Sequence, residues 1–299
     1  MKQFLQMLTA VLLVPLSAFS QQRFHKQMPP GNYSGICALG DNRYAVVNDK
    51  SAEDGFHVFR INIDTIRGRI TALTDEGFRS SRKPNTDMEA ICRFPPAGTL
   101  FAASEKTGEV REYTLDGQPT QRSLPLKTLL GGYNPGSGIE SLTYDARRHR
   151  FFTTTERPLK GDSLLTLLAF DDRLQLRETY RYRPDPPISR KYTHGVSELC
   201  ALADGRLLAL ERQIRVPRLK IGARTVVRLY EVELNGTVAR KRLLTELKTR
   251  LTLLGRRFAN YEGMCQVADG WLLLVADSQN RYRHVLRDWL LLLPIAKKK

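Results

Sequence analysis

Short apolar segments alternate with polar turn residues along the chain, and the segments recur five times in a two-part pattern. In each repeat, a first segment opens with a polar or acidic residue, and a second segment ends in an acid 14 to 16 residues later. A repeat of roughly 50 residues that carries strand-like segments indicates a radial array of β-sheets. The opening and closing residues are Ser34 with Asp49, Glu89 with Glu105, Glu140 with Glu156, Ser197 with Glu211, and Glu262 with Asp277; Glu198 is an alternative to Ser197.

Both segments of each repeat are predicted to be β-strands, because they are short, apolar and bounded by turn signals such as Asp204-Gly205 and Asp269-Gly270. Consecutive short strands with such turns form antiparallel hairpins. The start of the first strand then lies beside the end of the second. Five hairpins arranged around an axis would therefore place all ten positions at one end of the array.

About four strands are expected in each repeat; in the first they cover residues 36–39, 44–48, 57–63 and 69–74. The fifth repeat supplies only three, over residues 263–267, 271–276 and 289–294. We therefore predict an all-β fold, a single β-propeller of five blades, with six blades as the alternative. An N-terminal strand over residues 23–28 would complete the last blade and cover two exposed sheet edges.

The N-terminal 20 residues are typical of a secretory signal peptide. Lys2 gives a positive start, residues 8–16 form a short apolar core, and Ala18-Phe19-Ser20 is a small-x-small cleavage site. Residues 21–296 would then form the propeller domain, and residues 297–299 a basic tail. No later apolar run is long enough to span a bilayer. We predict an exported monomer, periplasmic or extracellular, without a transmembrane segment.

The chain carries a formal net charge of +16, which favours an anionic small molecule or another anionic partner. A generally basic, well-solvated surface is the alternative. The Lys and Arg residues are scattered and not clustered with stacking aromatic residues, so nucleic acid is not expected as a partner.

The four cysteines are Cys37, Cys92, Cys200 and Cys265, and each lies three residues after the opening of its repeat. Equivalent positions on neighbouring inner strands are too far apart for a disulfide, whose Cα separation rarely exceeds about 7 Å. We predict free, buried thiols that pack between sheets.

A ring of carboxylates at one mouth would bind cations, hold protons or pair with bases. Two carboxylates about 5 Å apart repel by roughly 3 kcal/mol at an effective dielectric of 20. Four of the closing acids are followed directly by a base, as in Asp49-Lys50 and Glu211-Arg212. One hypothesis is a hard-cation site with phosphate-binding bases; the other is a set of acid–base pairs that join blade to blade.

Several short segments resemble the phytase-like family, often described as "esterase-like activity of phytase". The segments that carry the likeness are Asp87-Met-Glu-Ala-Ile91, Gly138-Ile-Glu-Ser-Leu142, Gly195-Val-Ser-Glu-Leu199, Asp204-Gly-Arg-Leu-Leu-Ala-Leu-Glu-Arg212, Asn260-Tyr-Glu-Gly-Met264 and Leu274-Val-Ala-Asp-Ser-Gln-Asn280. The resemblance implies an exported propeller with repeated carboxylates, hydrolysis of phosphoesters or related esters, and Ca²⁺. Ser34 and Ser197 depart from a complete ring of acids.

The first functional hypothesis is a Ca²⁺-assisted phosphoester hydrolase. The residues expected to bind the metal are Asp49, Glu89, Glu140, Glu262 and Asp277. The residues expected to take part in catalysis are Glu105, Glu156 and Glu211. The residues expected to bind the substrate are Lys50, Lys106, Arg157, Arg212 and His194. The alternatives are a non-enzymatic propeller that binds an anionic ligand or partner protein, and a metal-dependent lactonase or carboxylesterase.

Overall fold

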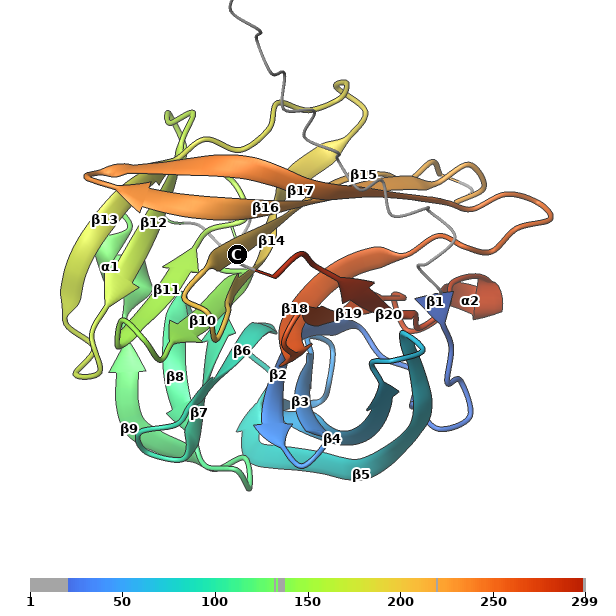
Figure 1. The fold of residues 1–299 in the computed structure, drawn as a ribbon, viewed down its shortest axis with the longest axis horizontal. Helices are drawn as coiled ribbons and strands as arrows, with labels where there is room; N and C mark the ends of the chain where they lie inside the picture. The colour runs from blue at the N-terminus through green and yellow to red at the C-terminus, as the bar shows by residue number, and fades with distance from the viewer. Residues whose placement is uncertain (1–20, 132, 134–137, 219, 298–299) are drawn as a thin grey trace, which may run out of the picture.

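The computed structural model describes residues 21–297 except 132, 134–137 and 219. The predicted signal peptide and the last two residues of the basic tail lie outside the described residues. Within these limits the chain is almost entirely β-structure (Figure 1), with short helices at α1 (Leu126–Leu129) and α2 (Tyr282–Val285). Neither helix is long enough or apolar enough to cross a membrane.

Each of the five sequence repeats forms a four-stranded antiparallel meander. The first contains β2 (Tyr33–Gly40), β3 (Arg43–Asn48), β4 (Glu53–Asp64) and β5 (Arg69–Pro84). The second contains β6 (Met88–Phe94), β7 (Thr99–Ser104), β8 (Glu109–Tyr113) and β9 (Pro119–Leu124). The third contains β10 (Ser141–Asp145), β11 (Arg150–Thr154), β12 (Leu165–Phe170) and β13 (Leu176–Tyr182).

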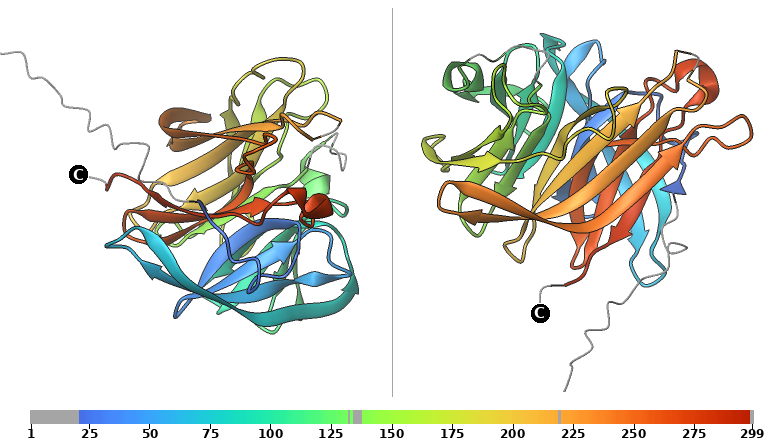
Figure 2. Two further views of the ribbon diagram at one scale, coloured as in Figure 1. Left: turned by 90° about the vertical axis from the view of Figure 1, so that its right-hand side faces the viewer. Right: turned by 90° about the horizontal axis from the view of Figure 1, so that it is seen from above.

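The fourth meander contains β14 (Thr193–Ala201), β15 (Leu207–Arg215), β16 (Arg224–Asn235) and β17 (Val238–Arg250). The fifth contains β18 (Asn260–Ala268), β19 (Trp271–Asp277), β20 (Leu290–Pro294) and the N-terminal β1 (Gln21–Gln22). Figure 2 shows β16 and β17 as a long ribbon on one side of the molecule.

The hairpins form where the turn chemistry predicts them. Between β2 and β3, Asp41 and Asn42 both adopt positive φ, at 51° and 59°. Two consecutive positive φ angles are the mark of a type I′ turn, and its twist matches that of the flanking strands. Strand β5 runs to Pro84, well beyond the predicted end of that strand at residue 74.

The meanders stand around a common axis, as a propeller requires. The inner strands β2, β6, β10, β14 and β18 contact one another in a closed ring. Every neighbouring pair of meanders shares its own apolar core; Phe101 and Phe151, for example, pack between the second and the third. A meander buries both faces only by packing on two neighbours, so the repeats stabilise one another. The all-β propeller is confirmed.

An N-terminal strand completes the last sheet, as predicted, but it is formed by residues 21–22 and not by residues 23–28. Gln21 pairs with Leu291 and Gln22 with Leu290, which completes the sheet of the fifth repeat. The predicted range, residues 23–28, instead forms a turn, because Phe24 and Met28 pack into the core between the fifth and first meanders.

A short parallel pairing of β13 with β17 joins the third and fourth meanders into one eight-stranded sheet. The blade count of five therefore stays a prediction.

The inner strands approach each other so closely that glycine is required at particular positions. A Cβ atom on Gly263 of β18 would overlap the carbonyl oxygen of Ser34 on β2. A Cβ atom on Gly35 would lie 2.7 Å from the Cα atom of Ala90 on β6. These contacts hold the ring tight just inside the end where the acids gather.

The four cysteines are free and buried, as predicted. Their side chains line a cavity of 540 Å³ among the second halves of the inner strands, together with Thr143 at the fifth equivalent position. This cavity lies at the opposite end of the ring from the acids.

Candidate functional site

The hairpin register gathers most of the predicted acids at one end of the ring. Met88 pairs with Ser104, Ser141 with Thr154, and Asn260 with Asp277. The start of each inner strand therefore lies beside the end of the next strand, as the sequence predicts. The acids that come together there belong to four of the five meanders: Asp49, Glu89, Glu105, Glu140, Glu156, Glu262 and Asp277.

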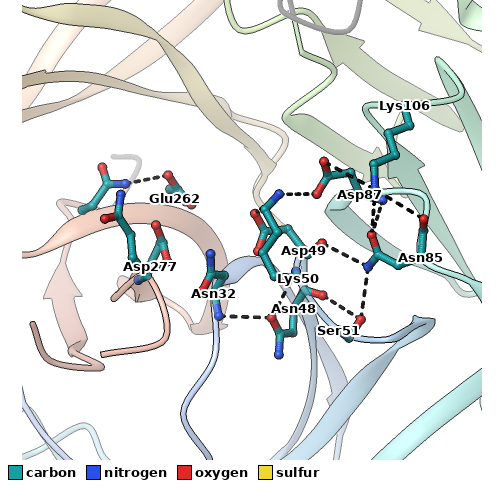
Figure 3. Close-up of polar contacts among 12 residues, drawn as sticks. Asn32, Asn48, Asp49, Lys50, Ser51, Asn85, Asp87, Lys106, Glu262 and Asp277 are labelled. Carbon is teal, nitrogen blue, oxygen red and sulfur yellow. Dashed lines mark hydrogen bonds and ion pairs between the residues drawn. The ribbon is translucent and has the colours of Figure 1, made fainter. Parts of the chain in front are cut away.

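The first group in this site is a carboxylate triad formed by Asp49, Asp87 and Glu89. One oxygen from each residue lies within 4.8 Å of the others. Asp49 follows β3, and the other two residues stand at the start of β6. Figure 3 shows Asp49 and Asp87 facing each other with the side chain of Lys50 between them. The triad offers three carboxyl oxygens in a small volume, which is the donor set that hard cations prefer.

Two lysines stand at the rim of the triad. The Lys50 Nζ atom lies 2.5 Å from Oδ1 of Asp87 and 3.1 Å from Oδ2 of Asp49. The Lys106 Nζ atom lies 4.0 Å from Oδ2 of Asp87 and 3.3 Å from Oδ1 of Asn85 (Figure 3). Both lysine side chains are more than half exposed. They are therefore accessible to a ligand that approaches the triad.

Asp87 was missed as a site residue, although it is the best-fixed member of the triad. Its φ angle is +62°, in the left-handed region that Asp tolerates better than most residues. Its N–H donates to Oδ1 of Asn85 at 2.9 Å, and its carbonyl oxygen accepts from the N–H of Glu105 at 2.8 Å. A sequence signal was present: Asp87 is two residues before Glu89, and residues i and i+2 of an extended segment face the same side.

The second group is centred on Arg212, which follows Glu211 in β15. Its Nη2 atom lies 3.0 Å from Oε2 of Glu140 and 3.1 Å from Oε1 of Glu156, and its Nη1 atom pairs with Glu262. These carboxylates come from the third and fifth meanders, so one buried guanidinium from the fourth meander ties three repeats together at the axis. Arg212 was predicted to bind the substrate, but the structure places it inside the acid ring rather than at its rim.

Burial and mutual repulsion raise the proton affinity of these acids. Burial raises the pKa of Asp49 to about 6; Lys50 opposes the shift, while Glu262 and Asp87 add to it. Burial also raises the pKa of Glu89 well above its ordinary value, with the charges of Asp49 and Glu262 acting in the same direction. These acids therefore keep their protons more readily than exposed carboxyl groups do.

Asp277 is also buried in this ring. Burial raises its pKa well above the ordinary value, and the nearby Glu262 carboxylate adds to the shift. One of its oxygens, Oδ1, accepts the N–H of Gln279 at 2.6 Å.

Glu105 and Arg157 lie between the two groups. Burial raises the pKa of Glu105, and the charges of Asp87 and Glu156 contribute. The Arg157 Nε atom lies 2.9 Å from Oε2 of Glu156, and about half of the Arg157 side chain is exposed. Glu105 thus faces both the triad and the Arg212 group.

Glu211 does not join the other acids. Its Oε1 atom accepts the hydroxyl of Tyr182 at 2.6 Å and pairs with Lys241, while its Oε2 atom accepts the N–H of Asp185 at 2.8 Å. Alternation along β15 turns Glu211 toward the third meander because Arg212 faces the axis.

His194 and Glu198 also lie apart from the triad. His194, which was expected to bind the substrate, is part of β14 and pairs there with Gln213. Oε1 of Glu198 accepts the N–H groups of Leu142 and Leu199 at 3.2 and 2.9 Å, which holds this carboxyl among the buried inner strands.

Comparisons with known proteins place this geometry in context. A family model described as phytase-like, with esterase-like activity of phytase, matches residues 28–279. No curated protein matches the sequence.

Among solved structures, a luciferin-regenerating enzyme matches with a TM-score of 0.49 and 9% identity, covering 93% of this chain and 98% of that one. A streptogramin B lyase matches with a TM-score of 0.43 and 13% identity, with the same two coverages. The β-propeller domain of Cps50 (Swd1) from Myceliophteria thermophila has a TM-score of 0.41 and 9% identity, covering 91% of this chain and 98% of that domain.

Proposed function

The chain belongs to the phytase-like family, and from that premise we propose that it is an exported hydrolase of phosphoesters that acts at the carboxylate triad. Family membership supports a propeller hydrolase in general terms. The observation that carries the more specific proposal is the combination of three converging carboxylates with two exposed lysines on the same rim. Carboxylates attract a hard cation, and lysines attract the phosphate of a substrate.

The residues of the triad fit Ca²⁺. Asp49, Asp87 and Glu89 supply only oxygen donors, and Oδ1 of Asp49 is buried without a hydrogen-bond partner among the described residues. A buried, unpaired carboxylate oxygen is costly, so it favours a ligand that completes its coordination. When bound, Ca²⁺ would act as a Lewis acid toward a phosphoryl oxygen.

The chain's own side chains account for the rest of the chemistry. Lys50 and Lys106 would hold the remaining phosphate oxygens by their ammonium groups. Glu105 is the best-placed general base, because its raised pKa brings it closer to neutrality and it lies next to the triad. Glu105 would take a proton from the water whose oxygen bonds to phosphorus. The bond between phosphorus and the ester oxygen breaks in the same step, and the departing alkoxide would take a proton from solvent. Glu156 already binds two arginines, and Glu211 lies elsewhere.

The test is phosphate release from inositol phosphates and aryl phosphates by the purified mature protein, with Ca²⁺ and with EDTA. We expect Ca²⁺-dependent turnover, together with a rise in melting temperature. Binding to the folded state alone contributes about 2.7 kcal/mol at a hundredfold excess over the dissociation constant. The variant Glu89→Gln should lose both effects. Asp269→Asn removes an exposed carboxylate paired with Lys297 and is the matched control.

The proposal fails if the wild-type protein releases no phosphate with any divalent ion, or if Glu89→Gln behaves like the control. A non-enzymatic anion-binding propeller is the second candidate. It is favoured by Arg212, which neutralises three acids of two meanders without any ligand. Stabilisation by an anionic ligand without turnover would support that candidate.

A further inference from the structure

Three arginines form a row across the outer strands of the fourth meander. Arg215 of β15 pairs directly with Arg224 of β16, and Arg224 pairs directly with Arg250 of β17. Directly opposite residues of antiparallel strands project from the same face, with Cβ atoms about 4.5–5.5 Å apart. Like charges in such positions are destabilising. The row therefore needs an explanation beyond the stability of the sheet.

No carboxylate neutralises this row in the part of the chain that the structure describes. None lies within 4.0 Å of the guanidinium groups of Arg215, Arg224 or Arg250. The nearest acid along β17 on this face, Glu246, is already engaged: its Oε2 atom lies 2.7 Å from Nε of Arg228, and its Oε1 atom 2.6 Å from Nζ of Lys248. The positive charge of the row is thus available to a ligand.

A cavity stands over two of these arginines. It has a volume of 420 Å³, and the residues that line it include Arg224, Arg228, Lys248 and Arg250, with Ile188 and Tyr192 from the crossover that precedes β14. Four cationic side chains and one aromatic ring therefore surround a space large enough for a small molecule.

A buried glutamine helps to fix the crossover to the sheet. The N–H of Ile188 donates to Oε1 of Gln213 at 2.7 Å, and Nε2 of Gln213 donates to the carbonyl oxygen of Pro186 at 3.1 Å. Gln213 itself is only 3% exposed. The wall of the cavity is consequently preformed and does not depend on a ligand for its position.

We propose that this groove, lined by Arg224, Arg250 and Lys248, is a binding site for a linear polyphosphate. Guanidinium groups bind phosphate oxygens in a two-pronged geometry. Arg224 and Arg250 lie on the neighbouring strands β16 and β17, about 4.8 Å apart, so they offer successive cations to successive phosphoryl groups. The site is separate from the carboxylate triad and does not rest on the proposed hydrolysis.

The probe is tripolyphosphate, and its affinity is compared with that of inorganic phosphate, which has only one phosphoryl group. Binding is measured by calorimetry in EDTA, so that no metal bridges the probe to the triad. We expect saturable binding of tripolyphosphate that is at least about tenfold tighter than that of inorganic phosphate and weakens with salt. The double variant Arg224→Gln/Arg250→Gln should bind tripolyphosphate at least about tenfold more weakly than wild type.

The matched control is Arg240→Gln/Arg242→Gln, which removes the same charge from β17 at positions that face Glu233 and Glu231. This control should retain wild-type affinity. The groove variant should also melt no lower than wild type without the probe, because it relieves repulsion.

Equal affinity in the groove variant and in the control would overturn the proposal, as would equal affinity for tripolyphosphate and inorganic phosphate. The variant Glu89→Gln should bind tripolyphosphate normally. Failure of phosphate release and failure of this site are thus distinguishable.

Discussion

Replacing Arg212 with methionine tests whether one buried guanidinium holds the acid ring together. Methionine keeps much of the length and the apolar stem of arginine but removes the charge. In the wild type, Arg212 binds Glu140, Glu156 and Glu262, and its side chain is 11% exposed. The substitution leaves three carboxylates in a buried setting without their common partner.

The expected loss follows from the cost of an uncompensated buried charge. Removing one partner of a buried ion pair typically costs about 3–5 kcal/mol. At roughly 2–4 °C per kcal/mol for a domain of about 150–250 residues, the melting temperature should fall by about 10 °C. This is a large fraction of the total stability of a typical domain, roughly 5–15 kcal/mol.

The loss should depend on pH with a defined sign. Burial, followed by the charge of Glu156, raises the pKa of Glu140, and burial raises the pKa of Glu262; in both cases Arg212 opposes the shift. Removing Arg212 raises both pKa values further. A carboxyl whose folded pKa is raised favours folding below its unfolded pKa, and that contribution is lost as pH rises through the folded pKa. The variant should therefore be closest to wild type in acid and furthest from it near neutrality.

The assay is urea unfolding of both proteins at about pH 5 and about pH 7.5 in EDTA. Arg206→Met is the matched control, because Arg206 is also buried and paired with acids, Asp204 and Glu231, away from the ring. A loss below about 1 kcal/mol at neutral pH, or the same loss at both pH values, would refute the reasoning.

Two further predictions concern the ring and its flank. Gly263→Ala should cost about 2–3 kcal/mol of unfolding free energy, because its methyl group overlaps the backbone of Ser34. Gly131→Ala should be tolerated, because no atom of the described residues lies within 4 Å of the new methyl group. Equal urea midpoints for the two variants would contradict this prediction. Burial lowers the pKa of His57 against the opposing effect of Asp75, so its contribution to stability is present above the unfolded pKa and is lost as pH falls through the folded one. As pH falls from about 7.5 to 5.5, the melting temperature of wild type should therefore fall relative to that of His57→Phe. A difference in melting temperature that stays constant with pH would contradict this prediction.

Much of the fold could be predicted from the sequence because the repeat unit is short and its turns are explicit. The opening of each first strand and the closing acid of each second strand fixed the hairpins and the shared end. The sequence could not predict which N-terminal residues form the closing strand, or where β5 ends. Gln21 and Gln22 close the ring because Phe24 and Met28 are drawn into a core that only the folded ring creates. Strand β5 runs to Pro84 because it pairs along the whole of β4, which no local propensity reports.

The site was predicted in outline but not in its pairing. The sequence places an acid and a base next to each other at the end of β15, and alternation requires them to face opposite sides. Which of the two faces the axis depends on the neighbouring meanders. Glu211 accepts a hydrogen bond from Tyr182 and pairs with Lys241, so the side chain of Arg212 faces the ring of acids. Asp87 was overlooked because it precedes the repeated opening residue rather than occupying it.

The two charged groups of the ring solve the same electrostatic problem in different ways. Around Arg212, a permanent cation from the chain compensates three acids and joins three meanders. At the triad, the cations within reach are Lys50 and Lys106, which are more than half exposed, while Oδ1 of Asp49 has no hydrogen-bond partner in the described part of the chain. An exposed lysine contributes little to stability, so the triad is held less tightly than the Arg212 group. Because Arg212 is a fixed internal cation, the acids that it binds have a structural role. At the triad, a buried carboxyl oxygen of Asp49 lacks a partner among the described residues, and this is where an external cation would find a ligand.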